Sequence, residues 1–194
     1  DTVADVTLCQ EETLESIVPD ACPDILRIVD VCGQATLSGK QAREGVAQVT
    51  GMVRASILYQ PEGGGGLRRM EVGLPFTCQA EAPGLTERGT AFARPRLRSA
   101  EARALNPRKV LLRVDLAVDI TACQPVERPI CTGVSVPEEN NLCQKQYQGE
   151  HYQLCAVQEK PFTFSDQVRL QGTGESPVLL AVRAQPVCTE SKLI

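Results

Sequence analysis

Aromatic rings, histidines and closely spaced cysteines are scarce in this sequence, and each shortage argues against a class of site. Aromatic residues make up 4% of the 194 residues and tryptophan is absent, whereas pockets that stack sugars or bases depend on such rings. His151 is the one histidine, and none of the nine cysteines forms a C-x-x-C pair, which argues against a zinc centre and thioredoxin-like chemistry. We therefore expect no metal, no cofactor and no catalytic residue.

Long apolar runs and an excess of positive charge are missing as well. No run approaches the roughly 18 apolar residues of a membrane span, and no signal peptide is evident after Asp1. Because the first residue is not Met, we expect the chain to belong to a longer product. The net charge of −4 argues against nucleic acid as the main partner, since neutralising phosphates requires a basic surface. We expect neither nucleic-acid binding nor membrane insertion.

The nine cysteines are dispersed along the chain, which suits disulfides formed in an oxidising or exposed setting. Because nine is an odd number, pairing within one chain leaves at least one thiol free or bridged to another chain. The alternative is that several of them are small buried hydrophobic residues. The candidates for cross-links between chains are Cys9, Cys188, Cys143 and Cys155.

Strict alternation of apolar and polar residues dominates residues 29–120, whereas residues 1–21 lack a sustained apolar period. Alternation with one polar face is typical of an antiparallel sheet that is buried on one side. Pro95 interrupts one of the runs, so we expect an edge strand there. The pattern predicts an all-β fold, either an antiparallel β-sandwich or a curled sheet with extended N- and C-terminal arms. The expected strands lie at residues 29–37, 47–59, 69–78, 90–104 and 110–120.

Composition divides the chain into four parts. Residues 176–182 echo residues 22–28, so the C-terminal part resembles the start of a second β repeat. A lone strand cannot bury its own apolar face, so this part must pair with the first domain or with another molecule. The four parts are an acidic N-terminal arm at residues 1–21, a β domain at 22–124, a Pro-rich and polar linker at 125–150, and the C-terminal segment at 151–194.

Charge is segregated along the sequence. The first thirty residues are strongly acidic, whereas arginines fall on one face of the expected strand at 90–104. In a head-to-tail assembly, the acidic arm of one copy would meet the arginine face of the next. The alternatives are a solvated outer face, where an ion pair contributes less than about 1 kcal/mol, and an anionic polymer bound to the arginines. The candidate subunit contacts are Arg94, Arg96, Arg98, Glu11, Glu12 and Glu15.

The order of several motifs resembles the SPOCS domain family of spore-forming Firmicutes. The resemblance covers about residues 18–124 and implies a structural role in spore envelope assembly. One type in this family adds a LysM module and binds the coat-organising ATPase, but no LysM-like segment is visible here. The residues that carry the resemblance are Val18-Pro19-Asp20, the run from Pro23 to Ile28, the strand from Gly45 to Tyr59, the segment from Glu71 to Phe76, and the turn from Asn106 to Val110.

Residues and resemblance together predict a non-enzymatic structural protein of bacterial endospores. It would self-assemble into a filament or a coat layer through strand addition between subunits, with intermolecular disulfides. Its partners would be further copies of itself and other spore envelope proteins. The expected location is the spore surface or an extracellular appendage, after synthesis in the mother cell. The alternative is a binding adaptor recruited to a spore-coat ATPase or to a cell-wall polymer.

Overall fold

A computed structural model describes residues 1–127 and, beyond them, 129, 131, 133, 145, 163–169, 178–180, 182, 184, 189 and 190. The chain divides into two compact units, one of Asp1–Val126 with Val178–Ile194 and one of Glu127–Pro177. Six strands lie in the first unit, and no helix occurs among the described residues. They are β1 (Thr2–Ile17), β2 (Ile25–Arg43), β3 (Val46–Pro61), β4 (Arg68–Glu81), β5 (Thr90–Asn106) and β6 (Lys109–Cys123).

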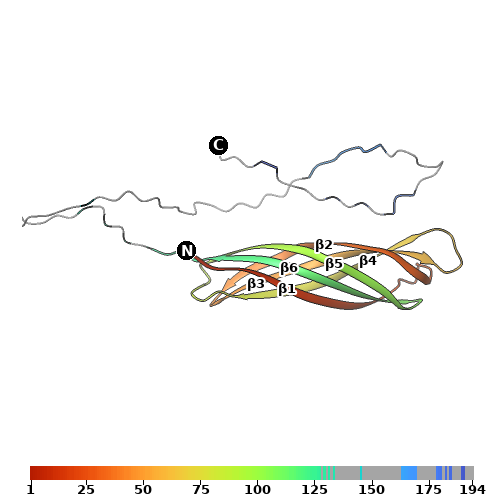
Figure 1. Cartoon of the computed structure of the whole chain (residues 1–194), viewed down its shortest axis with the longest axis horizontal. Coiled ribbons are helices and arrows are strands. Elements are labelled where there is room, and N and C mark those ends of the chain that lie inside the picture. The colour runs from red at the N-terminus through yellow and green to blue at the C-terminus, as the bar shows by residue number, and fades with distance from the viewer. Residues whose placement is uncertain are drawn as a thin grey trace, which may run out of the picture. The chain divides into compact units, whose positions relative to one another are not determined.

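The strands form two three-stranded sheets, β1-β6-β5 and β2-β3-β4, in which all hydrogen-bonded neighbours are antiparallel (Figure 1). β6 and β3 are the central strands, and the inner faces of both sheets contribute to one apolar core. The predicted all-β antiparallel sandwich is therefore confirmed. The strand that contains Pro95, β5, lies at an edge of its sheet, as expected.

The core follows the alternation that the sequence displays. Every second residue of β6 from Val110 to Ala122 is fully buried, and β3 contributes a second row from Ala47 to Tyr59. In β2 the alternation predicts that Val29 shares the inner face with Val31, Ala35 and Leu37, but Val29 is 47% exposed. The register shifts between Ile28 and Asp30, and such a bulge moves the following residue off the inner face.

The N-terminal segment corrects the expectation of an arm at residues 1–21. Thr2–Ile17 is a regular strand, β1, and pairs with the whole length of β6. The apolar period is weak because β1 is an edge strand and its inner row includes Gln10 and Glu12, opposite Leu116 and Val114. Because these inner positions are polar and only partly buried, the alternation of apolar and polar residues in β1 is weak, and the sequence alone does not identify β1 as a strand.

A glycine and an aromatic ring occupy one position of the core together. Gly51 lies in the inner row of β3, opposite Phe76 of β4. A Cβ atom at residue 51 would lie 2.2 Å from Cζ of Phe76 and 2.4 Å from the carbonyl oxygen of Thr36. The ring therefore fills the space that a side chain at residue 51 would need.

The boundaries of the β domain agree closely with the expected range of 22–124 at its C-terminal end, since β6 ends at Cys123. The connection between β3 and β4 contains Gly63 to Gly66, all of which have positive φ angles. Most of the expected linker and of the expected C-terminal repeat lies outside the described residues, so both remain predictions.

Candidate subunit-contact surface

Most of the candidate contact residues lie on one surface, the outer face of the sheet β1-β6-β5. Glu11 and Glu15 of β1 share the register levels of Asp115 and Leu111, whose side chains alternate with the buried row of β6. The exposed Arg96 is aligned with Ala117 of the same β6 row. The candidate arginines of β5 and these two glutamates therefore flank β6 from opposite sides, within a single molecule. We call this surface the outer face below.

The sixth candidate, Glu12, does not belong to the outer face. It alternates with Glu11 and is aligned with the buried Val114, so it lies in the inner row of β1. Its carboxylate oxygen accepts a hydrogen bond from Nε2 of Gln10 at 3.0 Å. Oε1 of Gln10 accepts one from the Cys78 thiol of β4 at 2.9 Å. Glu12 is thus part of a small polar cluster between β1 and β4.

The buried thiol of that cluster is held in its protonated form. Burial raises the pKa of Cys78, and the negative charge of Glu12 adds to the shift. Desolvation disfavours a thiolate inside an apolar core. Cys78 is therefore a packed core residue rather than a nucleophile.

Several of the candidate residues already form ion pairs with side chains of β6 within the same molecule. Glu11 and Glu15 pair with Arg113 and Lys109 of β6. These contacts show that the candidate side chains have partners without a second copy. A contact between copies would add to these pairs rather than create the first ones.

On the β5 side, the guanidinium group of Arg96 donates two hydrogen bonds to Asp119, at 2.9 and 3.1 Å. Arg98 lies 3.6 Å from the carboxylate of Asp115. Hydrogen bonds from Arg96 and from the Thr7 hydroxyl hold the pKa of Asp119 below its ordinary value. The hydrogen bond with Asp119 raises the pKa of Arg96 in turn. The carboxylate is thus stabilised in its charged form by groups on both neighbouring strands.

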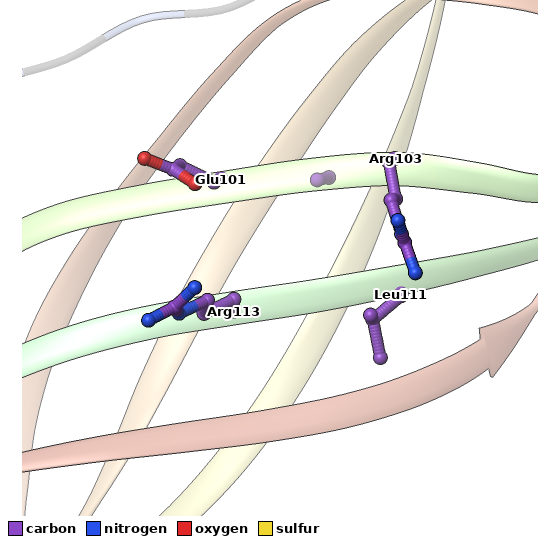
Figure 2. A pocket seen from close by; sticks show the side chains of 5 residues that line it. Glu101, Arg103, Leu111 and Arg113 are labelled. Carbon is purple, nitrogen blue, oxygen red and sulfur yellow. The ribbon is translucent and has the colours of Figure 1, made fainter.

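A shallow hollow lies on the outer face between β5 and β6 (Figure 2). Glu101 and Arg103 line it from β5, and Leu111 and Arg113 line it from β6. The residues are exposed or half-exposed charged and aliphatic side chains, with no nucleophile beside a base. We assign the hollow no catalytic role.

The cysteines fall into distinct environments. All six that lie within the described part of the chain are free thiols: Cys9, Cys22, Cys32, Cys78, Cys123 and Cys131. Cys9 is exposed on the outer face of β1, where its sulfur accepts a hydrogen bond from Nη1 of Arg98 at 3.7 Å. The other three candidates for cross-links, Cys143, Cys155 and Cys188, lie outside the described residues, as does His151.

Arg108 has a structural role that the sequence analysis missed. The Asn106-Pro107-Arg108 motif forms the turn between β5 and β6, as expected, but Arg108 does not face outward with the other arginines. Its guanidinium group donates to the carbonyl oxygens of Val18 and Cys22, at 2.9 and 2.7 Å. It also pairs with Asp20 and Asp24, at 3.2 and 3.1 Å. The sequence did contain an indication of this role, because the two Pro-Asp steps place two carboxylates close together, and such a pair favours a nearby cation.

Backbone hydrogen bonds complete this connection. The amide of Val18 donates to the carbonyl of Arg108 at 2.9 Å, and the amide of Ile25 donates to the carbonyl of Pro107 at 2.8 Å. The hydroxyl group of Tyr59 donates to the carbonyl of Pro23 at 3.3 Å. Three sequence motifs that are far apart along the chain therefore meet at one end of the sandwich.

These motifs are the ones on which the resemblance rests, and residues 24–105 match the family model described as SipL, SPOCS domain. The chain carries a SPOCS domain. The family assignment made from the motifs is confirmed, and it indicates a spore-associated, structural role. No curated protein and no solved structure matches the chain.

The fold extends beyond the residues that match the family model. The match ends at residue 105, whereas β6, the central strand of one sheet, follows at Lys109–Cys123. Without β6, neither β1 nor β5 would have a hydrogen-bonded neighbour in the sheet β1-β6-β5. The structural unit that contains this match therefore comprises at least Thr2–Cys123.

Metal-binding clusters and membrane-spanning helices are both absent from the described residues. Within them, no group of three or more His, Cys, Asp or Glu side chains is arranged to hold a metal ion. Those same residues contain no helix with the length and apolar character needed to cross a bilayer.

Proposed function

We propose that this SPOCS domain is a non-enzymatic structural subunit of the spore envelope, whose copies associate through sheet edges into a filament or layer. The observation that carries the proposal is the free edge of β1. From Ala4 to Ile17, β1 pairs with β6 without a register shift, and among the described residues it has no second hydrogen-bonded neighbour. A long regular edge offers unpaired N–H and C=O groups that another strand can satisfy.

The other three edges are less suited to strand addition. β2 has three register shifts in its pairing with β3. β4 and β5 each contain a proline, Pro75 and Pro95, which lacks an N–H group, and β5 also has register shifts near Ser99 and Asn106. Prolines and bulges are the means by which edge strands avoid pairing with other chains. β1 contains no proline and is regular after Ala4.

Disulfides between copies form the second part of the proposal. Cys9 presents an exposed thiol on the same strand whose edge is free. With nine cysteines in the chain, complete pairing within one molecule is impossible. Cys9 and the three candidates at residues 143, 155 and 188 would therefore link neighbouring copies once these lie side by side.

Negative-stain electron microscopy of the purified chain, combined with gels run with and without reductant, tests this function. We expect polymers in the micrographs, and a ladder of oligomers that reductant collapses to monomer. Cys9→Ser should weaken the ladder, whereas Cys32→Ser, which changes a half-buried thiol of β2, is the matched control. Monomer in both lanes together with no polymers in the micrographs would overturn the proposal.

A second candidate function, a binding adaptor for an anionic cell-wall polymer, has one observation in its favour. Arg94 and Arg103 are exposed on β5 and have no ion pair with any described residue. Their charge is available to an anion. This function predicts a monomer that sediments with purified cell-wall polymer, and loss of that binding in Arg94→Ala/Arg103→Ala. The recruitment to a spore-coat ATPase remains a prediction from the resemblance.

A further inference from the structure

The two edges of the sheet β1-β6-β5 carry opposite charge. Resting on the proposed self-assembly, we infer that the β1 edge of one copy docks against the β5 edge of a second copy. The contact would place the two sheets edge to edge, with hydrogen-bonded pairing in short stretches only. The partner of this surface is thus a second copy of the chain, approached from one defined side.

The charges along the two strands are complementary. β1 contains four acidic residues, Asp5, Glu11, Glu12 and Glu15, and no Lys or Arg. β5 contains four arginines, Arg94, Arg96, Arg98 and Arg103, and the single acid Glu101. Contact between an acidic and a basic edge is steered by attraction, whereas β1 against β1 or β5 against β5 is opposed by like charge.

The other sheet offers no equivalent pair of edges. β4 has two arginines and two glutamates, so it has no net charge. β2 has the cations Arg27, Lys40 and Arg43 against Asp30, so it is the other basic edge. However, β2 and β4 belong to the same sheet, and neither presents the acidic edge that a continuous second sheet would need.

Strand direction and register also fit a head-to-tail contact. β1 and β5 both run antiparallel to β6, so they are parallel to each other. Translating one copy sideways therefore brings β1 against β5 of the next copy without turning it over. Glu15 and Arg103 are both aligned with Leu111, so they lie at the same level of the sheet. A repeated translation of this kind generates an open filament or layer.

The backbone of β5 limits how much of the contact can be a hydrogen-bonded ladder. Pro95 has no N–H group, and the register shifts between Leu97 and Ser99. Leu97 also packs near Gly33 of β2, where an added Cβ would be 2.9 Å from its Cδ2 atom. Regular pairing is therefore available only in short stretches of β5. Side-chain charge must select the partner.

A charge-swap experiment on the full chain tests the inference. Asp5→Lys/Glu11→Lys/Glu15→Lys makes the β1 edge basic, and Arg94→Glu/Arg103→Glu makes the β5 edge acidic. Each variant alone would place like charges at every β1–β5 contact. A mixture of the two variants would restore opposite charges at each contact between unlike copies. Arg27→Glu/Arg43→Glu on β2 lowers the net charge by the same amount as the β5 variant and is its matched control.

Assembly is followed by light scattering and electron microscopy, after circular dichroism has shown which variants are folded. We expect each edge variant alone to assemble about tenfold more slowly or worse than the wild type. The equimolar mixture should recover wild-type assembly, and the β2 control should assemble normally. Edge variants that assemble like the wild type, or a mixture that fails to recover, would overturn the inference and leave the proposed function standing.

One further measurement covers the case in which an edge variant does not fold. If an edge variant does not fold, the salt dependence of wild-type assembly decides the question. Screening by 0.5 M NaCl must then slow assembly, because the Debye length falls to a few ångströms, and an insensitive rate would overturn the inference. If the wild type itself never assembles, the proposed function fails first, and the edge contact fails with it.

Discussion

The guanidinium group of Arg108 donates a hydrogen bond to the carbonyl oxygen of Val18, 90 residues earlier in the chain, at 2.9 Å. Arg108 is only 34% exposed and holds two carbonyl oxygens and two carboxylates of the connection between β1 and β2. This one side chain therefore ties the entry into β2 to the turn that precedes β6.

Replacing Arg108 should loosen that end of the domain. We expect Arg108→Ala to lower the free energy of unfolding by about 2–3 kcal/mol, because two backbone acceptors lose a charged donor. Arg108→Lys should recover little of the loss, since an ammonium group does not reproduce the planar fork. Urea unfolding measures both effects. Arg103→Ala is the control on the exposed outer face, and a loss of similar size there would contradict the role given to Arg108.

The contact between Gly51 and Phe76 predicts an asymmetry between two glycines on adjacent strands. Gly51→Ala should cost about 2 kcal/mol or more, because its Cβ would overlap the Phe76 ring and the Thr36 carbonyl. Gly73→Ala places its Cβ 3.4 Å from Sδ of Met52, an ordinary contact, and should change stability by about 0.5 kcal/mol or less. Thermal melts of both variants check the difference, and equal melting temperatures would refute the packing argument.

Cys78 predicts a loss of stability at alkaline pH. Burial, with a smaller contribution from Glu12, raises the pKa of this thiol in the folded protein. Above about pH 8.5 the unfolded chain therefore releases the proton while the native state keeps it. Stability should fall as pH rises further, by at most about 1.4 kcal/mol per pH unit.

Cys78→Ala should flatten this alkaline decline, as measured by urea unfolding at pH 7.5, 9 and 10 under reducing conditions. Cys32→Ala removes a half-buried thiol from the outer side of β2 and is the matched control. An equal flattening in both variants would show that the buried thiol is not the cause.

For Asp119 we expect the opposite pH dependence of stability, a loss at acid pH. The hydrogen bonds from Arg96 and Thr7 hold its pKa below the ordinary value in the folded state. The stability that this contributes is present at neutral pH and is lost as the pH falls below about 4, through the folded-state pKa. Asp119→Asn should therefore narrow the gap between melting temperatures at pH 7 and pH 3. Asp30→Asn, on the outer part of β2, should leave the gap as it is in the wild type.

The sequence predicts this fold well where a strand has one buried face. β3, β4 and β6 alternate without interruption, and their apolar rows are the rows that the structure buries. β1 could not be predicted in the same way, because Gln10 and Glu12 occupy its inner row. The bulges of β2 likewise leave no mark in the alternation, so Val29 was placed on the wrong face.

The candidate contact surface was only partly predictable. The charge segregation of β1 and β5 is visible in the sequence, but their positions on either side of β6 depend on long-range pairing. Local patterns do not specify which strand becomes the central one. For the same reason Arg108 could not be separated from the outward arginines, since its partners at Val18 and Cys22 are distant in the chain.

The first residue and the end of β6 are joined by a reciprocal pair of hydrogen bonds. The amino group of Asp1 donates to the carbonyl of Gln124 at 2.7 Å, and the amide of Gln124 donates to the carbonyl of Asp1 at 2.8 Å. A pulling force applied at these two residues would open β1 from β6 one rung at a time, as a zipper opens, because it acts across the strands at one end. A load transmitted along the polypeptide at these two residues would therefore be resisted by one rung of the β1–β6 pairing at a time.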